Sequence, residues 1–347
     1  MSTPGGGRRT EQAMQHTERL LVERELTFVS GRGNRSSPMT WRWKDRFALG
    51  LAWAAGIGLC LIAGAIVIYM GVRGIQYLRP GLLFSRPAVG AQQSETGGFL
   101  DPLLGTGLLT LIGIVVAVPL SVATALWISE YGRPTWLARI VESSIEIVAG
   151  TPDIVIALFG LAVFQITLFA PFSFKAAGGG VYGRSFIACG VMMSLIAMPP
   201  LFTATRDGLE SIPMHMREAA YALGKTRIAT IRRVLLPSVR SNIATGVTLG
   251  VSRIIGDTAI VVLLLGQSLR MESQGPVPGI GILRGVGSTL TSYVFDNSPA
   301  GEGAAPQKAY AAAFVLLLFV VVLNLIVGRI GRSQADATGL TAAGAIV

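Results

Sequence analysis

The sequence predicts an all-α, polytopic membrane protein with six transmembrane helices. Of its 347 residues, 51% are hydrophobic and only 14% are charged, and the mean hydropathy is +0.58. Apolar runs of about 18 residues or more are long enough to cross a bilayer as a helix. Six such runs occur: Phe47–Val72, Leu103–Ser129, Ile147–Phe172, Ser185–Thr205, Val239–Gly266 and Tyr310–Arg329. The lipid bilayer is therefore the first expected partner of this chain.

The distribution of basic residues orients these spans. The net charge is +10, which by itself is compatible with nucleic-acid binding. Most of the 29 Lys and Arg residues, however, lie before the first span, after the last one, or in the two connections on the same side as the termini. Lys and Arg are enriched in cytoplasmic loops, so both termini are expected in the cytoplasm. The basic excess reflects topology, and no nucleic-acid partner is expected.

The chain divides into a polar tail, a membrane domain and a second short tail. Residues 1–46 are rich in Gly, Arg, Ser and Glu and are predicted to form a mobile cytoplasmic N-terminal tail. The transmembrane domain is expected over 47–331, and a cytoplasmic C-terminal tail over 332–347. Within the domain, 267–308 is a long outer loop with many Gly and Pro residues. It is predicted either to contact an extracellular partner or to be a loosely ordered connector.

The third apolar run is predicted to break near Pro152. Thr151, Pro152 and Asp153 have the residue types of an N-cap, a first-turn proline and a first-turn acid, so a helix is expected to restart there. Helix N-termini can bind anions. Asp153 would occupy this one and repel an anion, which favours a self-capped helix break.

Acidic residues near the inner ends of spans two and three have less specific interpretations. Glu142 and Glu146 share one helix face and are predicted to form a solvated inner surface. Glu130 is expected to be either a structural partner of cytoplasmic arginines or part of a gate. The two cysteines and two histidines do not have the spacing of metal ligands. Neither a metal site nor a catalytic residue is expected.

A basic helix-turn-helix stretch separates the fourth and fifth spans. A buried hairpin between membrane helices would not carry so many cations, whereas a cytoplasmic segment that docks on another protein could. A helix is expected at about 214–227, with Gly224 ending it and Pro237 marking the entry to the fifth span. The cations are Arg217, Lys225, Arg227, Arg232 and Arg233.

The spacing of this segment resembles the coupling motif of ABC-importer permeases. The matching positions are Glu218, Ala219, Ala220, Gly224, Leu236 and Pro237. The resemblance implies that the two alanines keep the helix slim enough to enter a groove on an ATP-binding subunit. It also implies that ATP and Mg are bound by partner subunits, so this chain needs no cofactor and is not itself an enzyme. Gly224-Lys225-Thr226 is not a phosphate-binding loop, since that loop requires Gly at position 219 and a preceding strand.

Further motifs are similar to those of the A-type permease subunit of phosphate (Pst) ABC importers. They are Gly97-Gly98-Phe99, Thr151-Pro152-Asp153-Ile154-Val155 and Arg253-Ile254-Ile255-Gly256-Asp257-Thr258-Ala259. Three positions depart from the family pattern: Asp257 replaces Glu, Ile260 replaces Pro, and Asp153 replaces a small polar residue.

This resemblance implies an ABC type I importer permease fold in the bacterial plasma (inner) membrane. The implied cargo is inorganic phosphate, moved by ATP-driven alternating access. The implied partners are a second homologous permease, two ATP-binding subunits and an extracytoplasmic phosphate-binding protein. One alternative is an ABC importer for sulfate, molybdate or another small solute. An ion-coupled secondary transporter is the alternative from another class, but it should show inverted repeats, and no repeat is found.

Arg253 and Asp257 are the opposite charges expected inside one span. A charge at the bilayer centre costs about 2.5–3.5 kcal/mol on insertion scales, so such residues usually serve a pathway. Their i,i+4 spacing places them on one helix face, together with Gly246 and Gly250. The two glycines form a small-residue pattern for close helix packing. We expect this face to meet the second permease, with Arg253 contacting the anion and Asp257 neutralising Arg253. The alternative is a structural salt bridge.

Overall fold

The computed structural model describes residues 43–87, 97–132, 135–175, 179–266, 268–274, 278–299, 301 and 305–343. Every named element in this part of the chain is a helix, as the sequence predicts. The only extended pairings among these residues are isolated bridges such as Lys175 with Val181. The chain divides into two compact units, residues 1–68 and residues 69–347.

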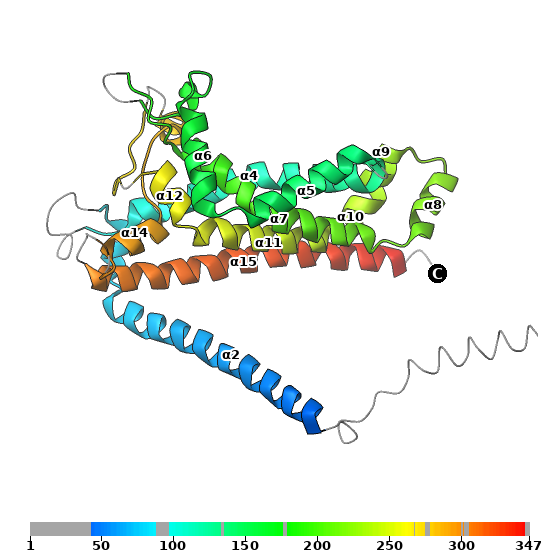
Figure 1. The fold of residues 1–347 in the computed structure, drawn as a ribbon, viewed down its shortest axis with the longest axis horizontal. Coiled ribbons are helices and arrows are strands. Elements are labelled where there is room, and N and C mark those ends of the chain that lie inside the picture. Colours follow the sequence, from blue (N-terminus) through cyan, green and yellow to red (C-terminus); the bar gives the residue numbers. More distant parts are fainter. Residues whose placement is uncertain are drawn as a thin grey trace, which may run out of the picture. The chain divides into compact units, whose positions relative to one another are not determined.

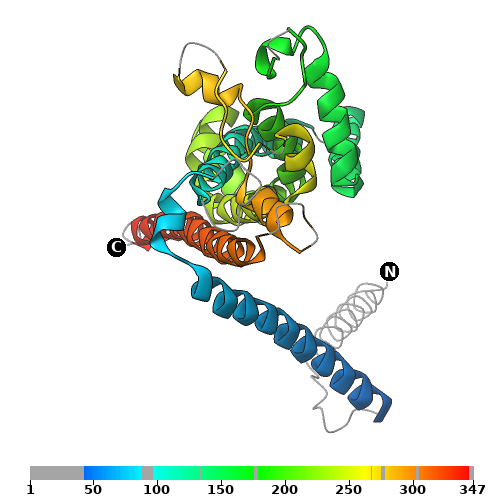
Figure 2. The same ribbon diagram turned by 90° about the vertical axis from the view of Figure 1, so that its left-hand side faces the viewer.

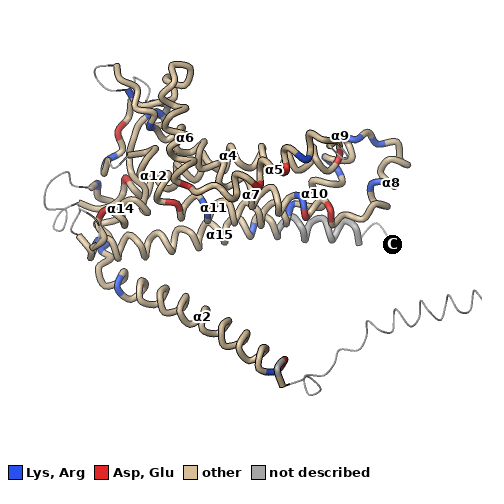
Figure 3. The backbone as a smooth tube through the Cα atoms, in the orientation of Figure 1, with Lys and Arg blue, Asp and Glu red and all other residues tan. Residues whose placement is uncertain are grey.

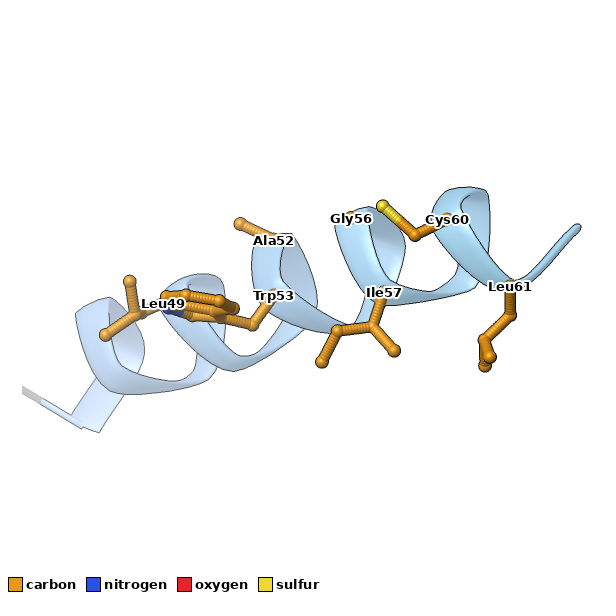
Figure 4. Close-up of a pocket in the computed structure, with 7 residues that line it drawn as sticks. All are labelled: Leu49, Ala52, Trp53, Gly56, Ile57, Cys60 and Leu61. Carbon is orange, nitrogen blue, oxygen red and sulfur yellow. The ribbon is translucent and has the colours of Figure 1, made fainter. Parts of the chain in front are cut away.

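Helix α2, Trp43–Tyr77, contains the first predicted span and is apolar around its circumference. Its side chains up to residue 68 are mostly exposed, large ones such as Trp53 and Leu59 included. Figure 4 shows a shallow apolar concavity on this helix, and all of its lining residues come from α2 itself. A helix that is hydrophobic all round is typical of a membrane span, so we interpret this concavity as helix surface that contacts lipid. Its lining residues are Leu49, Ala52, Trp53, Gly56, Ile57, Cys60 and Leu61.

The second unit is built around helix α7, Phe186–Glu210. It packs against α4 (Leu100–Trp127) and α11 (Arg240–Gly256), and α11 packs in turn against α15 (Pro306–Ala343). In Figure 1 these helices run side by side, and Figure 2, which looks along them, shows α15 at one side of the group. The apolar window of α7 is 67% buried, against 17% in α15. The fourth predicted span is therefore the centre of the unit.

Close packing between α7 and α11 depends on two glycines. A Cβ atom added to Gly246 would lie 3.0 Å from the Cα of Leu201 and 3.2 Å from the Cβ of Ala204. A Cβ at Gly250 would meet Ala197 at 3.4 Å. From the sequence, this glycine face was expected to lie against a second permease. That placement is wrong, because the glycine face packs on α7 of the same chain.

The third predicted span is broken at Pro152, where the sequence placed the break. Helices α5 (Trp136–Gly150) and α6 (Asp153–Gln165) meet at an angle of 109°. The predicted capping role of Thr151 is wrong: its Oγ1 donates to the carbonyl oxygen of Ile147 at 2.7 Å, and α6 has no side-chain cap on its N-cap residue. A residue before proline is driven out of the helical conformation. Thr151 accordingly ends α5 instead of starting α6.

The fifth predicted span is not one continuous helix. Helix α11 ends at Gly256, and the chain is extended at Asp257 (φ −79°, ψ 130°) before α12, Ala259–Leu264. The Oδ1 atom of Asp257 accepts the N–H of Ile260 at 3.0 Å in the first turn of α12. Because helical geometry stops before residue 257, the predicted i,i+4 relation between Arg253 and Asp257 does not form.

Four helices in the described residues are long and apolar enough to cross a membrane, or five if α5 and α6 together count as one span. The predicted total of six is not confirmed. The difference arises at the fifth predicted span, where α11 has 17 residues and stops at the Asp257 break.

The predicted tails and the outer loop contain more helix than expected. Residues 43–46 belong to α2, whereas 1–42 lie outside the described residues. The backbone of 332–343 continues α15. Loop 267–308 contains α13 (Pro278–Leu283) and α14 (Leu290–Asn297), and the buried Tyr293 packs on Phe99 with ring centroids 6.0 Å apart. A loosely ordered connector is therefore wrong for α14, while contact with an extracellular partner stays a prediction.

Replacing Gly246 with valine is expected to destabilise the bundle by about 1–3 kcal/mol, because the added atoms force α7 and α11 apart. Thermal unfolding of the purified chain in detergent measures the effect. Gly328→Val in α15 is the matched control, since a Cβ there meets nothing within 4 Å. Equal unfolding temperatures for the two variants would contradict the role of this close contact.

Candidate functional site

The basic stretch after α7 forms a short helix and a glycine turn. Helix α8 spans Met214–Ala222, and Gly224 follows with a φ of +73°. The N–H of Gly224 bonds to the carbonyl of Tyr221 at 2.9 Å, and the N–H of Lys225 bonds to that of Ala220 at 3.2 Å. This pair of bonds is the Schellman motif, which favours glycine at the left-handed position. The predicted helix end at Gly224 is confirmed.

The path from this turn to α11 contains three further short elements: α9 (Arg227–Thr230), the π-helical turn η4 (Ile231–Leu235) and α10 (Leu236–Ser238). Leu236 and Pro237 begin α10 and are half-buried. In Figure 1, α8 and α9 lie at one end of the bundle, and α12 and α14 lie at the other. Figure 3 shows basic residues gathered around α8–α10, whereas the helices between the two ends carry few charges.

Helix α8 presents the residues of the coupling motif to the outside. Glu218 and Ala219 are exposed, whereas Ala220 is buried on the inner side. No hydrogen bond or ion pair of Glu218 is found within the described residues. Apolar side chains, among them Leu223 and Ile228, are exposed beside it. A slim helix with an unpaired acid and exposed apolar neighbours is suited to docking.

Arg217 anchors α8 to the rest of the bundle. Its Nε donates to Oε1 of Glu130 at 3.1 Å, and its Nη1 and Nη2 donate to the carbonyls of Ile212 at 3.3 Å and Leu209 at 2.8 Å. The two charged side chains are only 15% and 7% exposed. Glu130 lies in η2 (Ile128–Gly132), the π-helical end of α4. One guanidinium thus joins α8 to the ends of α4 and α7.

The sequence left two roles open for Glu130, and the structure makes it the structural partner of two arginines. Besides Arg217, its backbone carbonyl accepts Nη1 of Arg227 at 3.3 Å, and the Arg227 guanidinium stacks over the Tyr131 ring at 5.4 Å. These side chains enclose part of a polar cavity beside α8. Its lining residues are Ser129, Glu130, Glu210, Met214, Arg217, Tyr221 and Arg227.

Glu142 on α5 was predicted to lie on a solvated surface, and this prediction is wrong because Glu142 forms an ion pair. Glu142 lies 3.3 Å from Nη1 of Arg206, and the Nε of Arg206 donates to Glu210 at 3.1 Å. Only Glu146 is exposed as expected. Residues 142 and 206 are far apart in sequence, and no local spacing indicated that they meet.

Arg253, the predicted pathway residue, pairs with a different acid from the one expected. Its Nη2 donates to both carboxylate oxygens of Asp153, at 2.8 Å and 3.1 Å. Arg253 sits near the end of α11, and Asp153 is the first residue of α6. The pairing with Asp257 is wrong, because Asp257 lies beyond the helix end and caps α12. The Asp257 side chain is buried, and its Oδ2 has no hydrogen-bond partner in the described residues.

Residues 110–335 match the family described as "Binding-protein-dependent transport system inner membrane component". The match covers more than half of the chain, including the coupling segment and Arg253. The chain belongs to this family of transport permeases. It is therefore a multi-pass membrane protein, in agreement with its long apolar helices.

Curated relatives of this permease extend the comparison. The "Probable ABC transporter permease protein YqgH" of Bacillus subtilis (strain 168) is 31% identical over 227 residues, 63% of this chain and 70% of the relative. "Phosphate transport system permease protein PstC" of Xylella fastidiosa (strain 9a5c) is 26% identical over 91% of this chain and 99% of its own. "Phosphate transport system permease protein PstA 1" of Mycobacterium tuberculosis (strain CDC 1551 / Oshkosh) is 28% identical over 66% and 69%. The relatives thus include both C-type and A-type permeases.

The fold of the permease is also that of solved transporters. A chain in the "Crystal structure of a bacterial ABC transporter involved in the import of the acidic polysaccharide alginate" has a TM-score of 0.56, with 17% identity over 84% of this chain and 98% of that one. At this identity the likeness concerns the fold alone, and it confirms the ABC-importer permease fold predicted from the sequence.

Replacing Arg217 with glutamine is expected to lower the stability of the permease by about 3 kcal/mol, because the buried Glu130 then lacks its charge partner. The double variant Arg217→Gln/Glu130→Gln should lose less than either single variant, since no unpaired charge remains. Thermal unfolding in detergent measures all three, with Arg233→Gln as an exposed control. Additive losses in the double variant would show that the two side chains are not coupled.

Proposed function

We propose that this chain is a permease subunit of an ATP-driven importer of inorganic phosphate. The match to a phosphate transport permease over 91% of this chain carries the proposal. The arginine-bearing helix α11 supports it, since a guanidinium suits the planar, bidentate binding of an oxyanion. The importer would contain this chain, a second homologous permease, two ATP-binding subunits and an extracytoplasmic phosphate-binding protein. It would lie in the bacterial plasma membrane with both termini of this chain in the cytoplasm.

Helix α8 would be the coupling helix. Closure of the ATP-binding subunits would displace α8, and the rigid Schellman turn at Gly224 together with the Arg217–Glu130 pair would transmit that displacement to α4 and α7. Such rigid-body motion opens a pathway alternately to each side of the membrane. ATP and Mg would be bound by the partner subunits, so this chain would supply motion and a pathway but no covalent step.

Arg253 would be the phosphate contact in the pathway. Its side chain is 52% exposed in the isolated chain, and its Nε and Nη1 have no hydrogen-bond partner within the described residues. Those N–H groups remain available to an oxyanion. The Arg253–Asp153 pair can also be read as a purely structural link between α6 and α11, and the experiment must separate the two readings.

Replacing Arg253 with glutamine in the reconstituted importer is expected to abolish phosphate uptake while the complex still assembles. Uptake of labelled phosphate into ATP-loaded proteoliposomes measures transport, and size-exclusion chromatography measures assembly. Arg329→Gln, at an exposed position in α15 outside the coupling segment, controls for the loss of a positive charge. Normal uptake by Arg253→Gln would remove this residue from the pathway. A wild-type importer that takes up labelled sulfate or molybdate but no labelled phosphate would favour another oxyanion as cargo.

Introducing arginine at the exposed Ala219 should uncouple the importer, because a long side chain prevents α8 from entering a groove on the ATP-binding subunit. Copurification of the ATP-binding subunit with the permease, and uptake, should both fall at least about tenfold. Ser238→Arg, also exposed but in α10, is the control. Unchanged copurification of the Ala219→Arg variant would exclude α8 as the docking element.

A further inference from the structure

The pairing of Arg253 with Asp153 has an asymmetric geometry. Both carboxylate oxygens of Asp153 contact the single atom Nη2, at 2.8 Å and 3.1 Å. The rest of the guanidinium is not used by the described residues, and the two side chains are 52% and 30% exposed. The acid therefore occupies one edge of the arginine and leaves the other edge open. An anion that reaches this surface finds free N–H donors next to a negative charge.

The two residues lie on different helices, both of which pack against α7. Asp153 is the first residue of α6, directly after the 109° bend. Arg253 is on α11, which packs against α7 and α15. Asp257 is the i,i+4 partner that the sequence suggested for Arg253. Its Oδ1 instead accepts the N–H of Ile260. Within the described residues, Asp153 is thus the acid that bonds directly to Arg253.

The Asp153 carboxylate binds Arg253 in the way that a transported oxyanion would. A guanidinium binds carboxylates and phosphates through the same donor groups. In an apolar environment an unpaired arginine is costly, and a paired acid offsets that cost. The same acid repels an incoming anion over a few ångströms. A transport pathway needs a site that binds its ion weakly enough to release it.

We propose that Asp153 is a built-in competitor for the transported anion. It holds the Nη2 edge of Arg253 between transport events, weakens anion binding at the open edge, and so prevents the anion from being trapped on the arginine. Asp153 is then a specificity-determining residue of the pathway. This inference rests on the proposed function in taking phosphate as the anion.

The test compares Asp153→Asn with the wild-type importer in nanodiscs without the binding protein. Equilibrium dialysis with labelled inorganic phosphate measures anion binding to the complete complex. Asp153→Asn should bind phosphate at least about tenfold more tightly, because the nearest negative charge is gone. Asp153→Glu should stay close to wild type, and the gain should disappear in Asp153→Asn/Arg253→Gln. In proteoliposomes, Asp153→Asn should import phosphate more slowly, since release is slower.

Two further variants control for the loss of any carboxylate and for failure of the asparagine variant to assemble. Glu146→Gln removes an exposed carboxylate from α5 and should leave phosphate binding unchanged. Asp153→Ser replaces the asparagine variant if that complex does not assemble. Phosphate affinity within twofold of wild type in an assembled Asp153 variant would overturn the proposal, as would a gain that survives Arg253→Gln.

Failure of the proposed function would be detected by measuring phosphate accumulation with the wild-type importer. A wild-type importer that accumulates no phosphate would refute the cargo, whereas the dialysis comparison does not depend on accumulation. Labelled sulfate in the same dialysis would then test the competition for another oxyanion.

Discussion

The contact between Arg217 and Glu130 is the buried ion pair that connects α8 to the membrane helices, and Arg227 of α9 adds a hydrogen bond to the carbonyl of the same Glu130. Without it, α8 would be joined to the bundle only by the chain on either side and by the apolar side of the segment, which includes the buried Ala220 and Leu235. With it, one guanidinium is bonded to an acid in η2 and to two carbonyls at the end of α7. Because both charges are largely removed from water, the geometry is specific: a small shift of α8 must either carry η2 with it or break the pair.

Charges in an apolar protein need partners, and three arginines of the second unit are paired for this reason. Arg217 is paired with Glu130 at the α8 end of the bundle, Arg206 lies between Glu142 and Glu210, and Arg253 holds Asp153. Apart from Arg206–Glu210, which lies within α7, each pair joins segments that are distant in sequence. Among these three, the exposure of the pair increases in the order given. Exposure alone does not assign a role, because Arg86 is 74% exposed in its pair with Asp101.

The packing of α7 explains why the two candidate sites can be connected mechanically. Arg217 bonds to the carbonyl of Leu209 in α7, and Gly246 and Gly250 bring α11 against the same helix. Displacement of α8 would therefore reach the helix that bears Arg253 through direct contact. The relatives include both C-type and A-type phosphate permeases, and the architecture described here does not depend on which of the two this chain corresponds to.

The sequence alone determined the class of protein, the apolar helices and the position of α8 with its glycine turn. These features are local. Hydropathy is summed over a run of residues, and the turn at Gly224 requires a left-handed backbone conformation that glycine favours. The break at Pro152 follows from proline itself. It also singled out Arg253, since a charge inside an apolar run is visible without coordinates.

Only the tertiary structure decided the partners. Asp153 and Arg253 are 100 positions apart, as are many pairs that do not meet, and the i,i+4 rule offered Asp257 as a nearer candidate. That rule failed because it assumes an unbroken helix, and α11 ends at Gly256. The face of Gly246 was identified correctly as a close-packing surface, yet its neighbour was assigned wrongly, since small residues indicate a close approach without indicating which helix approaches. Ion pairs and helix contacts depend on how distant segments fold together, and residue spacing along the chain does not indicate which segments meet.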